Sequence, residues 1–222
     1  MSSQTTAAAD VDQDPEGAEI TPFTDEPWVP RIMNLEVGLP SAAVAAGVGL
    51  LTWWLRADAG SVLAVATGIL CAVLVMLCVI DVMTKRLPDA IVLPAYPLLL
   101  LACAAAAAAG ETTWAALGTA LACMAGCYTL YWLVCFFSGG MGWGDAKLAG
   151  VLGLALGMAG PWDAAYGALV LPMALGGLVG FPLLFKGGGK AEMAFGPFMV
   201  AGAIPVLMMP DTLVPWLMDL VR

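Results

Sequence analysis

The chain has 222 residues, of which 61% are hydrophobic and 11% are charged, and it contains no histidine. This composition is typical of an integral membrane protein, and the lack of histidine excludes Ser-His-Asp catalysis and histidine zinc sites. The formal net charge is −9, with eight Lys and Arg against 17 Asp and Glu. We expect no nucleic-acid partner.

The first 35 residues hold seven of the acidic side chains and only one basic one. They are rich in Ser, Thr, Ala and Pro, a composition too polar to bury a core of its own. They also lack the basic start and apolar centre of a signal peptide. We predict a disordered acidic tail over residues 1–35, which either remains a solvated arm or attracts a basic substrate.

Long apolar stretches separated by short polar, Gly- or Pro-containing segments follow this tail. The pattern predicts an all-α, polytopic helical membrane protein in which residues 36–222 form one membrane domain. We expect about seven transmembrane helices, within a range of six to eight because a short apolar piece at 212–220 follows the last span. The seven predicted spans cover residues 39–55, 61–80, 91–109, 114–137, 145–162, 164–185 and 196–209.

The basic side chains predict the orientation, because cytoplasmic loops collect Lys and Arg. Six of the eight fall on one side of the predicted spans, and Arg56 falls on the other. We therefore predict a multi-pass protein of the plasma membrane with a cytoplasmic amino terminus. The six basic residues on the cytoplasmic side are Arg31, Lys85, Arg86, Lys147, Lys186 and Lys190.

Small side chains within the spans predict packing rather than a site. The six cysteines lie in apolar stretches without any Cys-x-x-Cys pair, so we expect small hydrophobic side chains and no disulfide framework, metal site or other cofactor. Two Gly-x-x-x-Gly pairs, Gly153 with Gly157 and Gly176 with Gly180, have the spacing that lets membrane helices approach closely.

Two aspartates differ from the other acidic residues because each directly adjoins a predicted span. Asp81 ends the apolar stretch 70–80, and Asp145 follows the glycine-rich segment 138–144. Ionisable groups at such a depth commonly face the bundle interior and serve function. By position alone, Asp145 could equally be a helix N-cap and Asp81 could face lipid headgroups. The four glycines before Asp145 exceed what a cap needs and would let a substrate approach it closely.

Three groups of residues carry a resemblance to a known family. Asp81 is followed by Leu87-Pro88-Asp89 and Val92-Leu93-Pro94, and further on by Gly142-Trp143-Gly144-Asp145-Ala146-Lys147-Leu148 and by Phe195-Gly196-Pro197-Phe198. In order and spacing these resemble the two aspartate motifs and the Phe-Gly-Pro-Phe segment of the type IV prepilin peptidases. The resemblance covers roughly residues 61–205.

The resemblance implies an aspartyl protease that removes the short basic leader from pilin-like or pseudopilin-like proteins at the cytoplasmic membrane face. The implied substrate has a glycine before a hydrophobic helix, and membrane lipid surrounds both proteins. Bifunctional members of the family also methylate the new amino terminus and carry an insert with Cys-x-x-Cys pairs. This chain has no such pairs, so it resembles the short, peptidase-only form. The resemblance further implies that Asp81 and Asp145 are the catalytic pair. We expect the residues that bind substrate or shape the site to be Gly142, Gly144, Asp89, Lys147, Phe195, Gly196 and Pro197.

Hydrolysis by two carboxylates requires one that is ionised, to draw a proton from water, and one that is protonated, to hydrogen-bond the carbonyl. Asp145 opens a predicted helix, whose positive end favours charge, whereas Asp81 closes one. We hypothesise that Asp145 is the base and Asp81 the acid. Asp89 is better explained as a helix N-cap and Lys147 as a headgroup anchor, and Pro197 fits the first turn of a helix.

Two other classes of function remain open at this point. A proton-coupled transporter of small solutes would also place two acids within a helical bundle, although we find no inverted repeat and both acids lie near one face. A catalytically silent assembly factor with the same fold is the other alternative. The natural substrate and the oligomeric state do not follow from the sequence.

Overall fold

A computed structural model describes four stretches of the chain, namely residues 35–85, 87–138, 142–185 and 194–221. The predicted acidic tail, except for its last residue, lies outside the described residues. So do four of the six basic residues predicted to be cytoplasmic, which are Arg31, Arg86, Lys186 and Lys190.

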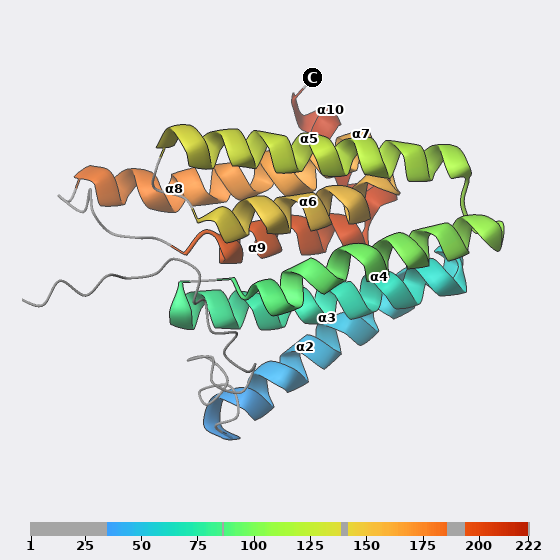
Figure 1. Cartoon of the computed structure of the whole chain (residues 1–222), viewed down its shortest axis with the longest axis horizontal. Coiled ribbons are helices and arrows are strands. Elements are labelled where there is room, and N and C mark those ends of the chain that lie inside the picture. Colours follow the sequence, from blue (N-terminus) through green and yellow to red (C-terminus); the bar gives the residue numbers. More distant parts are fainter. Residues whose placement is uncertain (1–34, 86, 139–141, 186–193, 222) are drawn as a thin grey trace, which may run out of the picture.

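Every element in the described part of the chain is a helix, which confirms the predicted all-α fold. Most of the helices lie side by side along the long axis of the molecule, and α2 is tilted across them (Figure 1). The elements are α2 (Leu35–Leu55), η2 (Ala57–Ala59), α3 (Ser61–Thr84), α4 (Asp89–Ala108), α5 (Trp114–Ser138), α6 (Trp143–Gly157), α7 (Pro161–Ala165), the π-helix η3 (Tyr166–Val170), α8 (Leu171–Phe185), α9 (Gly196–Met208) and α10 (Pro210–Val221).

Five helical segments of the described chain are long and apolar enough to cross a membrane. Four lie in α2, α3, α4 and α5, and the fifth runs through α7, η3 and α8 from Pro161 to Val179. The pair α9 and α10, bent by 111°, would make a sixth. The chain is therefore a multi-pass membrane protein, with fewer full-length spans than the seven predicted.

The difference in number comes mainly from α6. Its 15 residues rise by only about 22 Å, short of the roughly 30 Å hydrocarbon core of a bilayer. The sequence predicted one span over 145–162, but the structure ends α6 at Gly157 and begins a new helix at Pro161. Proline at the first position of a helix has no N–H to lose, which makes it a favourable start.

Helix α6 forms the centre of the bundle, where α4, α5, α7 and α9 pack against it. From Asp145 to Gly157, every residue except Lys147 is buried. A helix that is apolar all round and buried on every side is typical of a membrane-protein core. The site described below is therefore built on the least exposed helix.

Glycines allow α5 to approach α6 closely. A Cβ added to Gly153 would lie 2.6 Å from the carbonyl oxygen of Cys123, and one added to Gly157 would lie 2.7 Å from the Cα of Ala120. Both distances are too short for any side chain, so the predicted packing role of this glycine pair is confirmed. Of the second predicted pair, Gly176 packs against a phenylalanine ring, and the surroundings of Gly180 lie outside the description.

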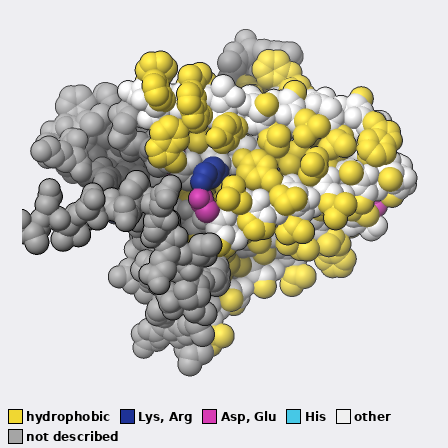
Figure 2. Space-filling view, in the orientation of Figure 1, with side chains coloured by type: hydrophobic (Ala, Val, Ile, Leu, Met, Phe, Trp, Pro, Cys, Tyr) yellow, Lys and Arg dark blue, Asp and Glu magenta, His cyan; other side chains and the backbone are white. Residues whose placement is uncertain are grey.

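Large hydrophobic side chains cover much of the outer surface, as Figure 2 shows for one face. Leu98, Leu101, Phe137 and Leu178, from three different helices, are each more than 60% exposed. In water such a surface would cause aggregation, whereas lipid tails are as apolar as these side chains. The surface thus agrees with a bundle surrounded by lipid.

The carboxylate of Glu111, between α4 and α5, caps the first turn of α3. It accepts hydrogen bonds from the backbone N–H of Val62 and of Leu63 at 3.0 and 3.2 Å and from the Ser61 hydroxyl at 3.1 Å. These hydrogen bonds lower the pKa of Glu111, and the bond from Val62 has the largest effect. Gly60 has a φ of 111°, and a Cβ there would lie 2.5 Å from the Glu111 carboxylate, so only glycine fits.

Candidate active site

Asp81 lies in the last turn of α3, with 3% of its surface exposed. The helix ends just after it because Lys85 adopts a left-handed conformation with a φ of 53°. The N–H of Lys85 donates to the carbonyl oxygen of Asp81 at 2.7 Å, which closes the turn. The carboxylate points to α9, where its Oδ2 accepts a 2.9 Å hydrogen bond from the N–H of Gly196.

Gly196 is the first residue of α9, and its lack of a side chain is what admits Asp81. A Cβ at this position would lie 2.5 Å from the Oδ2 and 3.0 Å from the Cγ of Asp81. Backbone N–H groups in the first turn of a helix have no partner within that helix, so the Asp81 carboxylate satisfies one of them. The predicted site residue Gly196 therefore contacts Asp81 directly.

Asp145 is the third residue of α6, and 6% of its surface is exposed. The N-cap position belongs to Gly142, and no side chain caps this helix, so the alternative that Asp145 is an N-cap is wrong. Its backbone N–H donates to the Gly142 carbonyl at 3.0 Å. Gly144 lies against the α3–α4 connection, since a Cβ there would be 2.9 Å from the Cβ of Leu87.

The fold brings Asp81 and Asp145 together at one end of the bundle. They are close enough for the charge of Asp81 to act on Asp145. Two buried carboxylates whose charges act on each other favour a state in which only one of them is ionised. This arrangement can supply a base and an acid at the same time.

Asp89 and Lys147 form an ion pair with each other. The Lys147 Nζ lies 2.7 Å from Oδ1 and 2.6 Å from Oδ2 of Asp89. The N-cap of α4 is Pro88, without a side-chain cap bond, so the predicted N-cap role of Asp89 is wrong. Its carboxylate binds the ammonium group instead, and Lys147 holds a partner on α4 rather than acting as a headgroup anchor.

The segment around Phe195 joins α9 to α5 and α8. Phe195 immediately precedes α9, and its ring centroid lies 6.1 Å from that of Tyr131 and 5.9 Å from that of Phe198. Gly176 of α8 gives this ring its space, because a Cβ there would lie 2.5 Å from the Cε2 of Phe195. Pro197 occupies the first turn of α9, as predicted.

Tyr131 is a residue of this region that the sequence did not single out. It is fully buried, and its hydroxyl donates a 2.9 Å hydrogen bond to the carbonyl oxygen of Ala168. In an α-helix that oxygen would accept from the N–H of residue 172, but residue 172 is a proline. The sequence contained one sign of this bond. Pro172 stands four positions after Ala168, so it cannot donate an N–H to the Ala168 carbonyl, and a side-chain donor takes its place.

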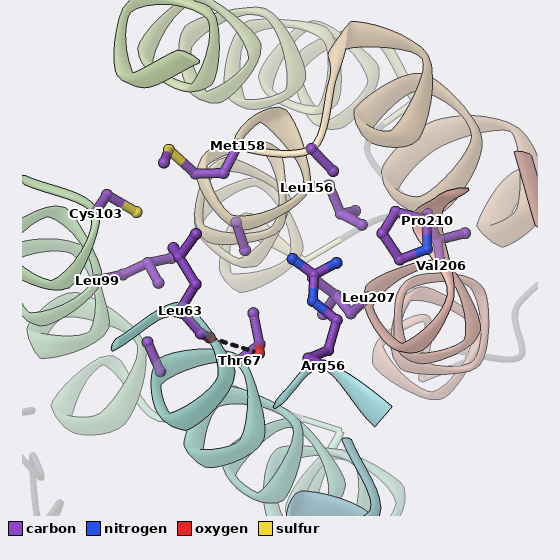
Figure 3. A pocket seen from close by; sticks show the side chains of 13 residues that line it. Arg56, Leu63, Thr67, Leu99, Cys103, Leu156, Met158, Val206, Leu207 and Pro210 are labelled. Carbon is purple, nitrogen blue, oxygen red and sulfur yellow. Dashed lines mark hydrogen bonds between the residues drawn. The ribbon is translucent and has the colours of Figure 1, made fainter. Parts of the chain in front are cut away.

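A pocket that Figure 3 shows from close by has neither aspartate in its lining, which includes Arg56 and Pro210 at the other end of the helices. Its lining is apolar apart from Arg56 and Thr67, and the guanidinium of Arg56 points toward Leu156 and Pro210. Within the described residues, no three or more His, Cys, Asp or Glu side chains come together as a metal site.

Comparison with known proteins decides the family. A sequence profile of the type IV leader peptidase family matches residues 68–181, which is 114 of the 222 residues. The chain belongs to this family.

Two curated relatives support the assignment. Both are named "Prepilin leader peptidase/N-methyltransferase", and they come from Burkholderia pseudomallei strains 1026b and K96243. Each is 33% identical over 177 residues, covering 77% of this chain and 53% of the relative. The chain thus spans about half the length of the curated relatives it matches. No solved structure matches the chain.

The family match includes Asp81 and Asp145 and extends from α3 into α8. The Phe195–Phe198 segment lies beyond the matched residues. The contact between Gly196 and Asp81 nevertheless connects that segment with the matched part.

Proposed function

We propose that this member of the type IV leader peptidase family is an aspartic-type endopeptidase that uses Asp81 and Asp145. The main support is that two buried aspartates from different helices, α3 and α6, lie close enough for the charge of Asp81 to act on Asp145. A carboxylate pair sharing one proton has the acid and the base that amide hydrolysis needs.

The proposed substrate is a prepilin-like protein with a short basic leader followed by a hydrophobic helix. The names of the two relatives support this substrate class. Cleavage would occur at the cytoplasmic face of the inner membrane. Lys85 and Lys147 lie at the same end of the helices as the aspartates, and Arg56 lies at the other, which is the charge asymmetry expected of cytoplasmic and outer ends.

In the proposed reaction, water attacks the scissile carbonyl carbon and gives a proton to the ionised carboxylate. The protonated carboxyl transfers its proton to the carbonyl oxygen, producing a neutral tetrahedral species. As the C–N bond breaks, the first carboxyl protonates the departing nitrogen, and a hydroxyl of the tetrahedral carbon returns a proton to the second. The pair again shares one proton, and no covalent enzyme intermediate forms.

The substrate must also expose its amide bond, because a helical amide is shielded by its own hydrogen bonds within lipid. A glycine at the cleavage position lowers the cost of unwinding the substrate helix there. We therefore propose cleavage after a glycine, directly before the hydrophobic helix.

Co-expression with a prepilin-like protein tests the proposal. Wild type should shorten the substrate by its leader, whereas Asp81→Asn and Asp145→Asn should leave it intact. Asp58→Asn is a matched control, because Asp58 is an exposed acid in η2 at the opposite end of the bundle. Normal cleavage by both buried-site variants would refute the proposal, and the mass of the mature product would also reveal any methylation.

The same experiment addresses the two alternatives. A proton-coupled transporter would use acids near the middle of the membrane, but Asp81 is in the last turn of α3 and Asp145 in the first turn of α6. A catalytically silent factor would leave the substrate intact with wild type and every variant.

A further inference from the structure

Each catalytic aspartate is followed on the same chain segment by one member of the Asp89–Lys147 ion pair. Asp89 begins α4 just after the α3 turn that holds Asp81, and Lys147 is two positions after Asp145 in α6. The ion pair is bidentate, with N–O distances of 2.7 and 2.6 Å. It therefore joins the two catalytic segments without involving either catalytic carboxylate.

A second contact ties the backbone at Lys147 to α4. The hydroxyl of Tyr96 donates a 2.6 Å hydrogen bond to the carbonyl oxygen of Lys147. Gly150 makes this possible, because a Cβ there would overlap the Tyr96 hydroxyl. The side chain and the backbone of Lys147 are thus both bound by residues of α4.

A third contact lies on the other side of Asp145. Gly144 approaches Leu87 so closely that an added Cβ would be 2.9 Å from the Leu87 Cβ. Leu87 lies in the short connection between Asp81 and Asp89. The segment after Asp81 therefore contacts α6 on both sides of Asp145. Leu87 packs against Gly144, and Asp89 pairs with Lys147.

We infer that the Asp89–Lys147 ion pair is a clamp that sets the separation of Asp81 and Asp145, assisted by the contacts of Tyr96 and Leu87. This inference rests on the proposed function, and it makes Asp89 and Lys147 positioning residues. The side chains of Lys147 and Asp89 are 31% and 55% exposed. An ion pair this exposed contributes little to global stability, yet a shift of about 1 Å between reacting groups can cost about 100-fold in rate.

The experiment compares Asp89→Asn, Lys147→Met and the exchanged pair Asp89→Lys with Lys147→Asp, as purified full-length proteins in lipid nanodiscs. Each single variant should lower kcat on a prepilin-like substrate about tenfold or more, with a KM within about twofold of wild type. The exchanged pair should recover part of the lost kcat. Asp58→Asn, which removes an exposed charge at the opposite end of the bundle, should keep the wild-type kcat.

The pH profile separates positioning from a general structural role. Two coupled carboxylates give a bell-shaped dependence of kcat on pH, and the width of the bell reflects how strongly the two carboxylates interact. Single variants that let the aspartates separate should narrow the bell, and the exchanged pair should widen it again. Unchanged kcat and width in both single variants, or a raised KM alone, would overturn the inference.

Amide hydrogen exchange tests the clamp even if the proposed function fails. Exchange in residues 87–92 and 143–148 should become faster in both single variants and slow again in the exchanged pair. Wild type that cleaves no substrate but shows this pattern would refute the peptidase proposal and keep the clamp. Exchange that is equal in all variants would refute the clamp, whatever the activity.

Discussion

The backbone N–H of Gly196 donates a 2.9 Å hydrogen bond to the Oδ2 of Asp81, across 115 positions of sequence. This contact brings the N-terminus of α9 to the C-terminal turn of α3. The partial positive charge at a helix N-terminus favours a carboxylate, and a free N–H adds a hydrogen bond to it. Asp81 therefore has its hydrogen-bond donor on a helix other than its own.

This contact changes the argument for which aspartate is ionised. From the sequence we hypothesised that Asp145 is the base, because it opens a helix and Asp81 closes one. In the structure both carboxylates lie at a helix N-terminus, Asp145 within α6 and Asp81 facing α9. Asp81 thus faces the negative end of α3 and the positive end of α9, which oppose each other, so helix dipoles distinguish the two acids less than the sequence indicated.

Gly196→Ala should impair catalysis strongly. The new Cβ would lie 2.5 Å from the Asp81 Oδ2, so the carboxylate must move away from its place beside Asp145. We expect kcat to fall about 100-fold with a smaller change in KM, measured on a prepilin-like substrate. Gly177→Ala is the control because a Cβ there has nothing within 4 Å. Equal activity of both alanine variants would contradict this account of Gly196.

Tyr131→Phe should destabilise the protein. The substitution removes the donor to the Ala168 carbonyl, and Pro172 offers no N–H in its place. Leaving one buried acceptor unsatisfied costs about 1–3 kcal/mol in the free energy of unfolding. Denaturant unfolding in mild detergent measures it, with Tyr128→Phe, an exposed position on the same helix, as the control. A loss no larger than that of the control would show that the bond is dispensable.

Glu111→Gln should remove stability at neutral pH but not in acid. Hydrogen bonds from Val62 and its neighbours lower the pKa of Glu111 in the folded protein, so the carboxylate stabilises the fold at pH values above its unfolded pKa of about 4.3. The contribution is lost as the pH falls through the lower, folded pKa. The Tm of wild type should therefore exceed that of the variant at pH 7, and the difference should shrink below pH 4. A difference that is independent of pH would contradict this role.

Gly153→Val should separate α5 from α6. Even a Cβ at this position would lie 2.6 Å from the Cys123 carbonyl oxygen, so the two backbones must move apart. Overpacking of this kind typically costs about 1–3 kcal/mol, which thermal unfolding in nanodiscs would detect. Gly126→Val on α5 is the comparison, because no atom lies within 4 Å of a Cβ there. Similar Tm values for the two variants would argue against close packing at Gly153.

The fold class followed from the sequence alone, and so did the choice of Asp81 and Asp145 as site candidates. Apolar runs of about 20 residues have few alternatives to membrane helices, because unpaired backbone groups are too costly in lipid. Asp81 and Asp145 were recognisable because an ionisable side chain at the edge of such a run is expensive unless it has a function. An apolar run and an acid at its end can both be recognised within one stretch of sequence. Neither requires knowing which helices pack beside that stretch.

The partners of these residues were decided only by the tertiary structure. Gly196 with Asp81, Lys147 with Asp89, and Tyr131 with Ala168 join positions 115, 58 and 37 residues apart. Local rules assigned Asp89 to a helix cap and Lys147 to headgroups, because each rule considers only the helix that carries the residue. Hydrogen bonds and ion pairs depend on distances of about 3 Å, and only the packing of helices that lie far apart in the sequence fixes those distances.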